Sequence, residues 1–400
     1  MVFASLLFAL HPIQAHAVNI VSIRGDLLAA CFALLALQAF FARKTVFLAI
    51  ALLFALLSKE TSMVLPVAIF FTWVLIQRDH QGTRVTLAFV ILGIYLAIRL
   101  SLGFSFSLPP SVFSYDAPWD IRWLLAFKVL ALYFLALLNP FEMPHSFWSV
   151  QLPTSLSEPY VLSGMLISVL LILAIWAVFK RSPMAAFGLI WFAIYFFPIS
   201  NIKQLNQPMA EHWLYIPMIG LCLAAGAVLD VPRIRLLEIR LLRLGVLTTA
   251  ATFLVFAALV AREKTRIYQD DETFLLAAIR ANPNVAKLYS ILGSTYLARE
   301  DVSRAKEFYG KALNLDPNDF VANYRTGFLF YQEGEPKKAE VYLAKVVRSE
   351  PRPLYEILPV AHAWEMLGDR QKAVFYYRKG LKLDPHSARI QQKVAALEAQ

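Results

Sequence analysis

Nine charged or titratable side chains gather in three short polar links of an otherwise apolar stretch of sequence. The links are ALHPIQAHAVNIVSIRGDLLAA (9–30), LLSKETSMVLP (56–66) and FPISNIKQLNQPMAEHWLYIPMIG (197–220). Cationic groups beside carboxylates can bind a phosphate and can orient a hydroxyl group or a metal ion. We therefore take as candidate binding residues His11, His16, Arg24, Asp26, Lys59, Glu60, Lys203, Glu211 and His212.

The composition indicates that these links lie in a lipid-embedded domain. Of the 400 residues, 58% are hydrophobic and 16% are charged, whereas soluble domains carry about 25% charged residues. Residues 1–262 contain 17 lysines and arginines against 10 acidic residues, and residues 263–400 contain 21 against 18. We predict a multi-pass membrane domain over 1–262 and a water-soluble domain over 263–400.

Nine apolar runs in the first 262 residues predict an all-α bundle of transmembrane helices, because backbone polar groups in lipid must be satisfied within each segment. Residues 1–10 are too short to span a bilayer and lack the features of a cleavable signal peptide. We expect them to be the tail of a helix that starts upstream, and the chain to be truncated. The runs are 27–41, 46–57, 62–76, 85–102, 123–138, 161–179, 184–197, 213–229 and 244–260.

The basic residues predict the orientation of this bundle. Lysines and arginines concentrate in the links at 42–45, 77–84, 180–182 and 230–243, which the positive-inside rule assigns to the cytoplasm. The three candidate links then share the opposite side. The domain at 263–400 follows on that non-cytoplasmic side, and we expect the chain to lie in the cell (inner) membrane.

The run at 123–138 does not fit this alternation. If it crosses the membrane fully, every later link changes side and the arginine-rich link at 230–243 becomes external. We predict that this run begins and ends on the same side or lies shallow. The alternative is a full crossing combined with a second, miscounted helix.

The last part of the chain repeats itself every 34 residues. Prolines recur at 317, 351 and 385, and alanines at 305, 339 and 373. This pattern is typical of tetratricopeptide repeats, paired helices that stack into an α-solenoid. We predict a half repeat at 272–283, a capping helix at 388–400 and full repeats at 286–319, 320–353 and 354–387.

The three polar links resemble segments of the transmembrane and tetratricopeptide-repeat O-mannosyltransferases and their bacterial relatives. The family patterns are His-Pro…Gly-Arg-Ala-Asp-Leu-Leu-Ala, Leu-Ser-Lys-Glu-Thr and Pro-x-Ser-Asn…Ala-Glu-Arg-Tyr-Leu-Tyr. The resemblance implies a C-type glycosyltransferase that moves a mannose-like sugar from a polyprenyl-phosphate carrier to an acceptor hydroxyl, on protein in the best-known cases. The matching residues are His11, Arg24, Asp26, Lys59, Glu60 and Glu211.

Two features depart from that family. His16 stands where the family usually has Glu, and His212 where it usually has Arg. The family's acidic catalytic pair lies in a loop that would precede Met1, so the catalytic residues are unknown and we expect these 400 residues to be inactive alone. We assign no cofactor and no metal ligands, although the chemistry allows a divalent metal.

Two other classes of function compete with a transferase. A non-enzymatic membrane scaffold would use its repeats to bind peptides or partner proteins. A transporter is less well supported, because transporter sites lie near mid-membrane and these polar groups collect at one face. We do not expect nucleic-acid binding, because cytoplasmic links account for most of the net charge of +10.

Overall fold

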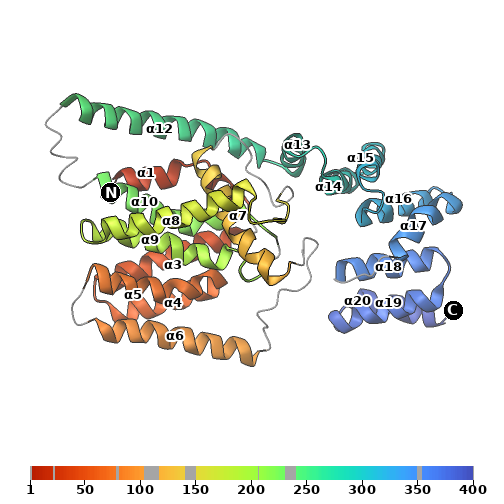
Figure 1. Cartoon of the computed structure of the whole chain (residues 1–400). Helices are drawn as coiled ribbons and strands as arrows, with labels where there is room; N and C mark the ends of the chain where they lie inside the picture. The colour runs from red at the N-terminus through yellow and green to blue at the C-terminus, as the bar shows by residue number, and fades with distance from the viewer. Residues whose placement is uncertain are drawn as a thin grey trace. The chain divides into compact units, whose positions relative to one another are not determined.

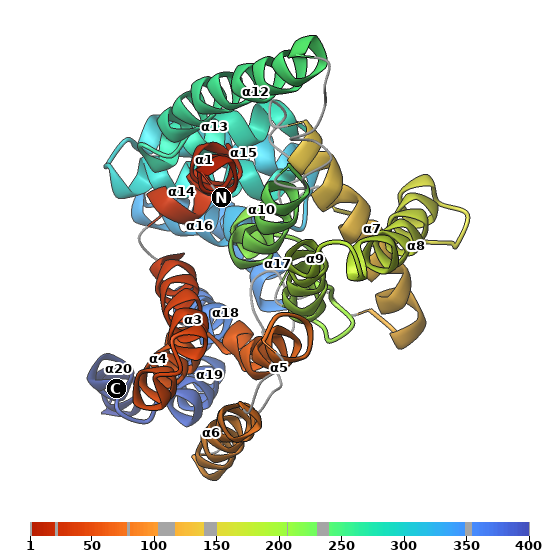
Figure 2. The same ribbon diagram turned by 90° about the vertical axis from the view of Figure 1, so that its left-hand side faces the viewer.

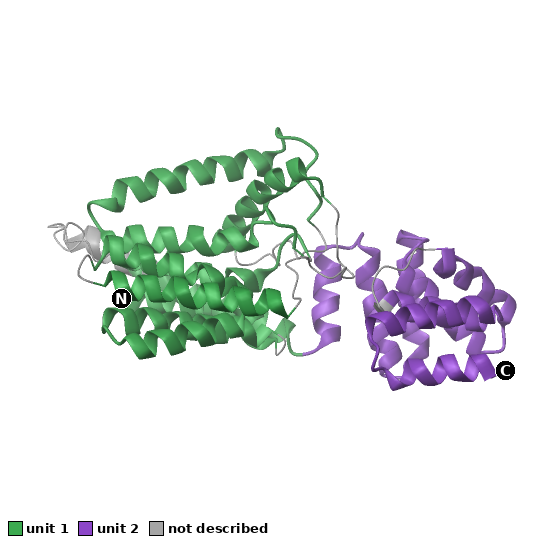
Figure 3. Cartoon of the chain, turned by 90° about the horizontal axis from the view of Figure 1, so that it is seen from below, with its two compact units in different colours: residues 1–107, 115–269 green, residues 108–114, 270–400 purple. Residues whose placement is uncertain are grey.

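The computed structural model describes residues 2–20, 23–77, 81–102, 117–139, 150–205, 207–229, 240–348 and 354–399. Every regular element in these ranges is a helix (Figure 1). The chain divides into two compact units, residues 1–107 with 115–269 (unit 1) and residues 108–114 with 270–400 (unit 2) (Figure 3). The boundary that we predicted at 262/263 falls within the last turns of helix α12 (Arg240–Ile267).

Unit 1 is built from the apolar runs, each of which overlaps a helix. Three short 3-10 helices occur beside the α-helices, η2 (Glu60–Val64), η3 (Phe197–Ile199) and η4 (Glu211–Leu214). Besides α12, the α-helices are α1 (Val2–Leu10), α2 (Gln14–Asn19), α3 (Arg24–Phe41), α4 (Thr45–Ser58), α5 (Leu65–Leu75), α6 (Gly82–Ser101), α7 (Trp119–Leu138), α8 (Pro159–Phe179), α9 (Pro183–Phe196) and α10 (Tyr215–Leu229).

Five helical segments among the described residues are long and apolar enough to cross a membrane: α3, α6, α7, α8 and Glu211–Val228. Helices α4 and α9, and α5 together with η2, are apolar but shorter. The predicted run at 244–260 lies in α12, which is not among the five. Much of the apolar surface is exposed, for example Ile94 at 56% and Leu166 at 59%. Exposed apolar faces of this extent are typical of surfaces that contact lipid or another apolar partner.

Helices α9 and α10 form the tightest contact in the core of unit 1. A Cβ atom added to Gly188 would lie 2.4 Å from the carbonyl oxygen of Gly220, so the two backbones approach as only glycine allows. The indole N–H of Trp191 donates to the carbonyl oxygen of Ile216 over 2.9 Å. The apolar core therefore also fixes the start of α10, which lies within the third polar link.

Helix α7 takes a course different from its neighbours. It is steeply inclined to α6 and α9 in both Figure 1 and Figure 2. It packs on α8 at Gly164, where a Cβ atom would lie only 1.8 Å from the carbonyl oxygen of Phe127. Whether the run at 123–138 begins and ends on one side of a membrane stays a prediction.

The two ends of the bundle carry different groups. At the turn between α3 and α4, Arg84 donates to the carbonyl oxygen of Arg43 over 2.9 Å and to the hydroxyl of Thr45 over 3.0 Å. Helix α4 begins at this basic turn and ends at Ser58, directly before Lys59 in the second polar link. The basic residues Arg43 and Arg84 and the candidate residue Lys59 therefore lie at opposite ends of α4.

Unit 2 contains the helix pairs that the repeat predicts. The turns between paired helices share one left-handed residue, with φ of 64° at Glu300, 76° at Gly334 and 80° at Gly368. These positions are 34 residues apart, and Glu300 adopts the conformation that glycine favours in the other two turns. The helices are α13 (Asp271–Ala281), α14 (Ala286–Ala298), α15 (Val302–Leu315), α16 (Phe320–Gln332), α17 (Pro336–Arg348), α18 (Leu354–Met366), α19 (Arg370–Leu383) and α20 (Ala388–Ala399).

Small residues bring the two helices of each repeat together. A Cβ atom on Gly293 would lie 2.7 Å from the Tyr309 ring, and one on Gly327 would lie 2.8 Å from the Leu343 side chain. The third repeat has Ala361 at this position, and it is fully buried. The alanines at 305, 339 and 373 are also buried, in agreement with the predicted packing.

The close approach at Gly164 can be tested by substitution. We expect Gly164→Ala to lower the free energy of unfolding by about 1–3 kcal/mol or more, because the added methyl group overlaps the backbone of α7. Gly93→Ala on α6 is the matched control, since a Cβ atom there meets nothing within 4 Å. Thermal unfolding of the detergent-solubilised chain measures both, and equal melting temperatures would contradict the packing described.

Candidate functional site

An ion pair joins the first two polar links. Asp26 lies buried in the first turn of α3, and Lys59 follows the last residue of α4 and donates to both of its carboxylate oxygens. The helices meet closely here, since a Cβ atom on Gly25 would lie 3.1 Å from the carbonyl oxygen of Ser58. Arg24 is exposed at the first residue of α3.

A second ion pair joins the third link to the end of α12. Glu211 and Lys264 are 3.7 Å apart, and their side chains are only 8% and 7% exposed. The hydroxyl of Tyr268 donates to the other carboxylate oxygen of Glu211 over 3.4 Å. Lys264 and Tyr268 were absent from the sequence-based candidates. They are four residues apart, a spacing that places two side chains on one face of a helix, and this spacing was the one signal in the sequence that could have identified them.

Three aromatic rings pack against one another beside this ion pair. The His16 ring stacks on Tyr268 with centroids 5.2 Å apart, and it meets His212 edge-on at 5.1 Å. The Nδ1 atoms of His16 and His212 are buried and have no hydrogen-bond partner among the described residues. Burial, together with the charge of Lys264, lowers the pKa of His16 to about 4. His16 is therefore neutral at pH 7 and offers a hydrogen bond, not a cation, to a ligand.

His11 has a structural position. Its Nδ1 accepts a hydrogen bond from the backbone N–H of Ile13 over 3.3 Å, and its Nε2 lies 3.1 Å from the carbonyl oxygen of Leu137. Burial lowers its pKa to about 4, so that the neutral ring with the proton on Nε2 suits both contacts. With both nitrogens bonded to backbone, His11 ties the first polar link to the end of α7.

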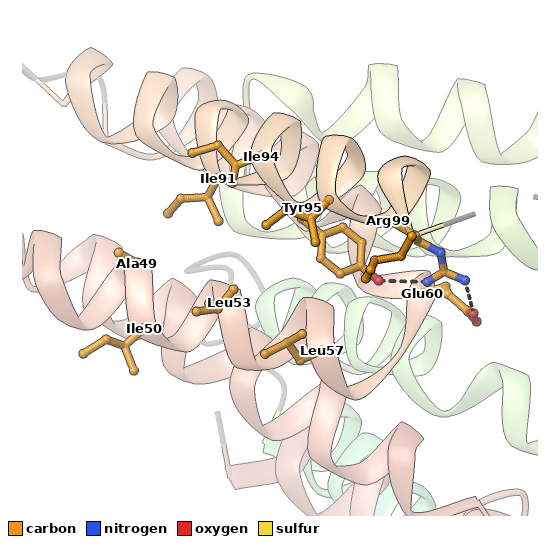
Figure 4. A pocket seen from close by; sticks show the side chains of 11 residues that line it. Ala49, Ile50, Leu53, Leu57, Glu60, Ile91, Ile94, Tyr95 and Arg99 are labelled. Carbon is orange, nitrogen blue, oxygen red and sulfur yellow. Dashed lines mark hydrogen bonds and ion pairs between the residues drawn. The ribbon is translucent and has the colours of Figure 1, made fainter. Parts of the chain in front are cut away.

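Glu60 belongs to an outer group of charges that includes Lys203. Arg99 at the end of α6 donates to Glu60 over 2.6 Å and to the Tyr95 hydroxyl over 2.9 Å (Figure 4). Lys203 is exposed, and its pKa is lowered by partial burial and by the charge of Arg99, while Glu60 acts in the opposite direction. Arg99 is the third residue that the sequence-based candidates lacked, after Lys264 and Tyr268.

Hydrogen bonds from α7 and within the link itself fix the backbone of the third link. The buried hydroxyl of Tyr133 donates to the carbonyl oxygen of Ala210 over 2.9 Å and accepts from the N–H of the same residue over 3.2 Å. Within the link, Asn201 has a positive φ of 65° and its side-chain amide donates to the carbonyl oxygen of Pro208 over 2.5 Å. These bonds hold the backbone immediately before Glu211.

The site as a whole therefore joins three links and the ends of two further helices. The edge-on contact of the His16 ring with the His212 ring joins the first link to the third. Each of four cations faces a carboxylate or lies near one: Lys59, Arg99, Lys203 and Lys264. Such a set can exchange an internal partner for a bound phosphate. Within the described ranges, no three His, Cys, Asp or Glu side chains are arranged to hold a metal ion.

The fold and this site define a class: an all-helical protein with an apolar helix bundle and a C-terminal array of tetratricopeptide repeats. The family model "Tetratricopeptide repeat" matches residues 286–319 and 365–387. The chain is thus a tetratricopeptide-repeat protein in its C-terminal part, and such repeats suggest binding to other proteins.

Two relatives show similarity over part of the chain. Anaphase-promoting complex subunit 3 of Schizosaccharomyces pombe is 24% identical over 118 residues, which cover 30% of this chain and 18% of that protein. Protein CTR9 homolog of Arabidopsis thaliana is 29% identical over 117 residues, 28% of this chain and 11% of that protein. The chain therefore matches less than a fifth of either relative. The resemblance drawn from the three polar links stays a prediction.

The buried pair of Glu211 and Lys264 makes a prediction about stability. Lys264→Met leaves the Glu211 carboxylate buried beside no cation, and we expect a loss of about 3–5 kcal/mol. The double variant Glu211→Gln, Lys264→Met should lose much less, because neither charge remains. Arg266→Met, which removes an exposed pair with Glu263, is the control and should change stability by at most about 1 kcal/mol. Thermal unfolding of the parent chain and these three variants tests this, and a double variant that loses as much stability as Lys264→Met would contradict the prediction.

Proposed function

We propose that unit 1 is the lipid-embedded part of a glycosyltransferase that binds a polyprenyl-phosphate-linked sugar, mannose-like, for transfer to an acceptor hydroxyl, and that unit 2 binds a protein acceptor or partner. The observation that carries the proposal is the meeting of three separated polar links at one end of an apolar bundle. Ionisable groups placed there are costly unless they serve a polar site. The resemblance of the three links to the O-mannosyltransferase family supports the same reading.

The role that we propose for each side chain follows from its charge and its contacts. Lys59, which also interacts with His212, is the cation best placed to hold the carrier phosphate once Asp26 releases it. Neutral His16 and the carboxylate of Glu211 suit hydrogen bonds to sugar or acceptor hydroxyl groups. During transfer the bond between sugar and phosphate breaks and a bond to the acceptor oxygen forms. The hydroxyl proton passes to a general base that is not among these residues.

Donor binding tests the proposal on the chain itself. We expect Lys59→Ala in nanodiscs to weaken binding of a polyprenyl-phosphate mannose at least tenfold, because a charge-assisted hydrogen bond to phosphate is lost. Lys44→Ala at the opposite end of α4 is the matched control and should bind normally. Helix content by circular dichroism verifies folding, and Lys59→Arg should retain binding. Donor affinity that is unchanged in Lys59→Ala would refute the role.

A non-enzymatic membrane scaffold is the second candidate function. It is favoured by the repeats, which match the tetratricopeptide model, and by the two relatives found. The two functions differ in one measurement. A transferase requires labelled sugar to move from a polyprenyl-phosphate donor to protein in membranes that contain this protein. Loss of transfer in Arg24→Ala and Glu211→Ala, with partner capture by unit 2 intact, favours the enzyme.

We further propose that unit 1 lies in the cell (inner) membrane, with the polar site and unit 2 on the non-cytoplasmic side. The basic link with Arg43, Lys44 and Arg84 then lies in the cytoplasm. A periplasmic reporter enzyme fused after residue 400 should be active, and a cysteine placed at Thr45 should be labelled only after the cytoplasmic side is opened. An active cytoplasmic reporter at the C-terminus would reverse this orientation.

A further inference from the structure

Aromatic side chains join two repeats of unit 2 on the side formed by the first helices of the repeats. Helix α16 lies between α14 and α18 on this side. The rings of Tyr324 and Phe328 on α16 stack with centroids 6.4 Å apart, and His362 on α18 lies 5.7 Å from Phe328. The Tyr324 hydroxyl lies 2.9 Å from Nδ1 of His362. All three side chains are partly exposed, and we call the surface that they form the aromatic face.

Two arginines lie beside the aromatic face. The guanidinium carbon of Arg325 is 5.6 Å from the centre of the Tyr324 ring. Arg389 on α20 is exposed, and its charge acts on both His362 and Tyr324. The charges of both arginines oppose the rise that burial causes in the pKa of Tyr324. Among the described residues, neither guanidinium forms an ion pair.

The acidic side chains on this side of unit 2 already lie near cations. Glu365 on α18 accepts a hydrogen bond from Lys393 over 2.7 Å. Asp319 and Glu356 both interact with the charge of Lys287 on α14. The two arginines therefore remain beside the aromatic rings as positive charges that an acidic ligand can reach.

His362 adds a hydrogen-bonding group to this surface. Burial, together with the charges of Lys393 and Arg389, lowers the pKa of His362, although Glu365 acts in the opposite direction. The ring is therefore neutral at pH 7. It can accept a hydrogen bond from the Tyr324 hydroxyl at Nδ1 and donate one from Nε2 to a peptide carbonyl oxygen.

We propose that the aromatic face binds an acidic peptide segment of a partner protein, with carboxylates at Arg325 and Arg389 and an apolar side chain over Phe328 and His362. The inference deepens the proposed function, in which unit 2 binds a protein, and it holds whether or not unit 1 is a transferase. A guanidinium group binds a carboxylate through two parallel hydrogen bonds. Tyrosine and arginine are also enriched among the residues that contribute most to protein interfaces.

The charge of unit 2 favours a peptide over a nucleic acid. Aromatic rings and arginines can also bind single-stranded RNA. Residues 263–400, however, carry 21 lysines and arginines against 18 acidic residues. A domain that binds a continuous phosphate backbone is usually strongly basic, whereas a peptide needs only a few carboxylates that match the arginines.

Selection from a phage-displayed library of random peptides, with the full chain in nanodiscs as bait, tests the proposal. We expect Asp and Glu to outnumber Lys and Arg in the recovered peptides relative to the unselected library. Fluorescence anisotropy then measures the affinity of one recovered peptide. Arg325→Gln with Arg389→Gln should weaken this affinity at least about tenfold, because charge-assisted hydrogen bonds to the carboxylates are lost.

Two further double variants control for folding and for charge. Arg280→Gln with Arg370→Gln removes the same charge from α13 and α19, outside the aromatic face, and should leave the affinity unchanged. Arg325→Lys with Arg389→Lys should retain part of the binding. Helix content by circular dichroism verifies that each variant folds.

Three results would overturn the proposal: recovery of neutral or basic peptides, equal affinity in the Arg325→Gln, Arg389→Gln variant, or tighter binding of a fluorescent oligouridylate than of the peptide. Recovery of neutral or basic peptides would remove this inference alone, because unit 2 would still bind protein segments. Recovery of no peptide above empty nanodiscs would also count against protein binding by unit 2. The two proposals can therefore be told apart when they fail.

Discussion

Ionised side chains at the end of an apolar helix bundle need a partner of opposite charge, and this requirement governs the candidate site. Asp26 has Lys59, Glu211 has Lys264, and Glu60 has Arg99. Each pair joins residues that are far apart in sequence, so each one also fixes the position of two helix ends. The same contacts that make the charges tolerable therefore bring the polar links together. Replacing one member affects both the fold and any ligand that competes for the charge.

The ion pairs also differ in how far their charged groups are exposed to a ligand. The Glu211 carboxylate is buried with Lys264 and Tyr268, whereas Glu60 is largely exposed. A ligand can reach the Glu60 group without disturbing the core, but it must displace an internal partner at Lys59. Ligand binding at Lys59 would therefore require an exchange of ion-pair partners, whereas contact with Glu60 would not.

Sequence patterns predicted the helices well, because long apolar runs and a 34-residue repeat leave few alternatives. They also identified Asp26, Lys59, His16, Glu211 and His212, since charged groups within apolar sequence are conspicuous. They missed Lys264, Tyr268 and Arg99, which follow or end apolar runs and look like ordinary interfacial residues. Their partners are set by how helices pack, and no local pattern carries that information. The pairing of Lys59 with Asp26, which joins two separate polar links, likewise had no local signal in the sequence.

Helix α12 contributes Lys264 near its end, Tyr268 follows it directly, and unit 2 begins at Asp270. In an α-helix each residue advances the side-chain direction by about 100°. One residue inserted before Lys264 would turn its side chain away from Glu211, whereas residues inserted after Gln269 would lengthen the connection and leave the cluster intact. The direction in which α12 presents Lys264 and Tyr268 thus restricts insertions and deletions in the segment before Tyr268. The connection after Gln269 can change in length without this restriction.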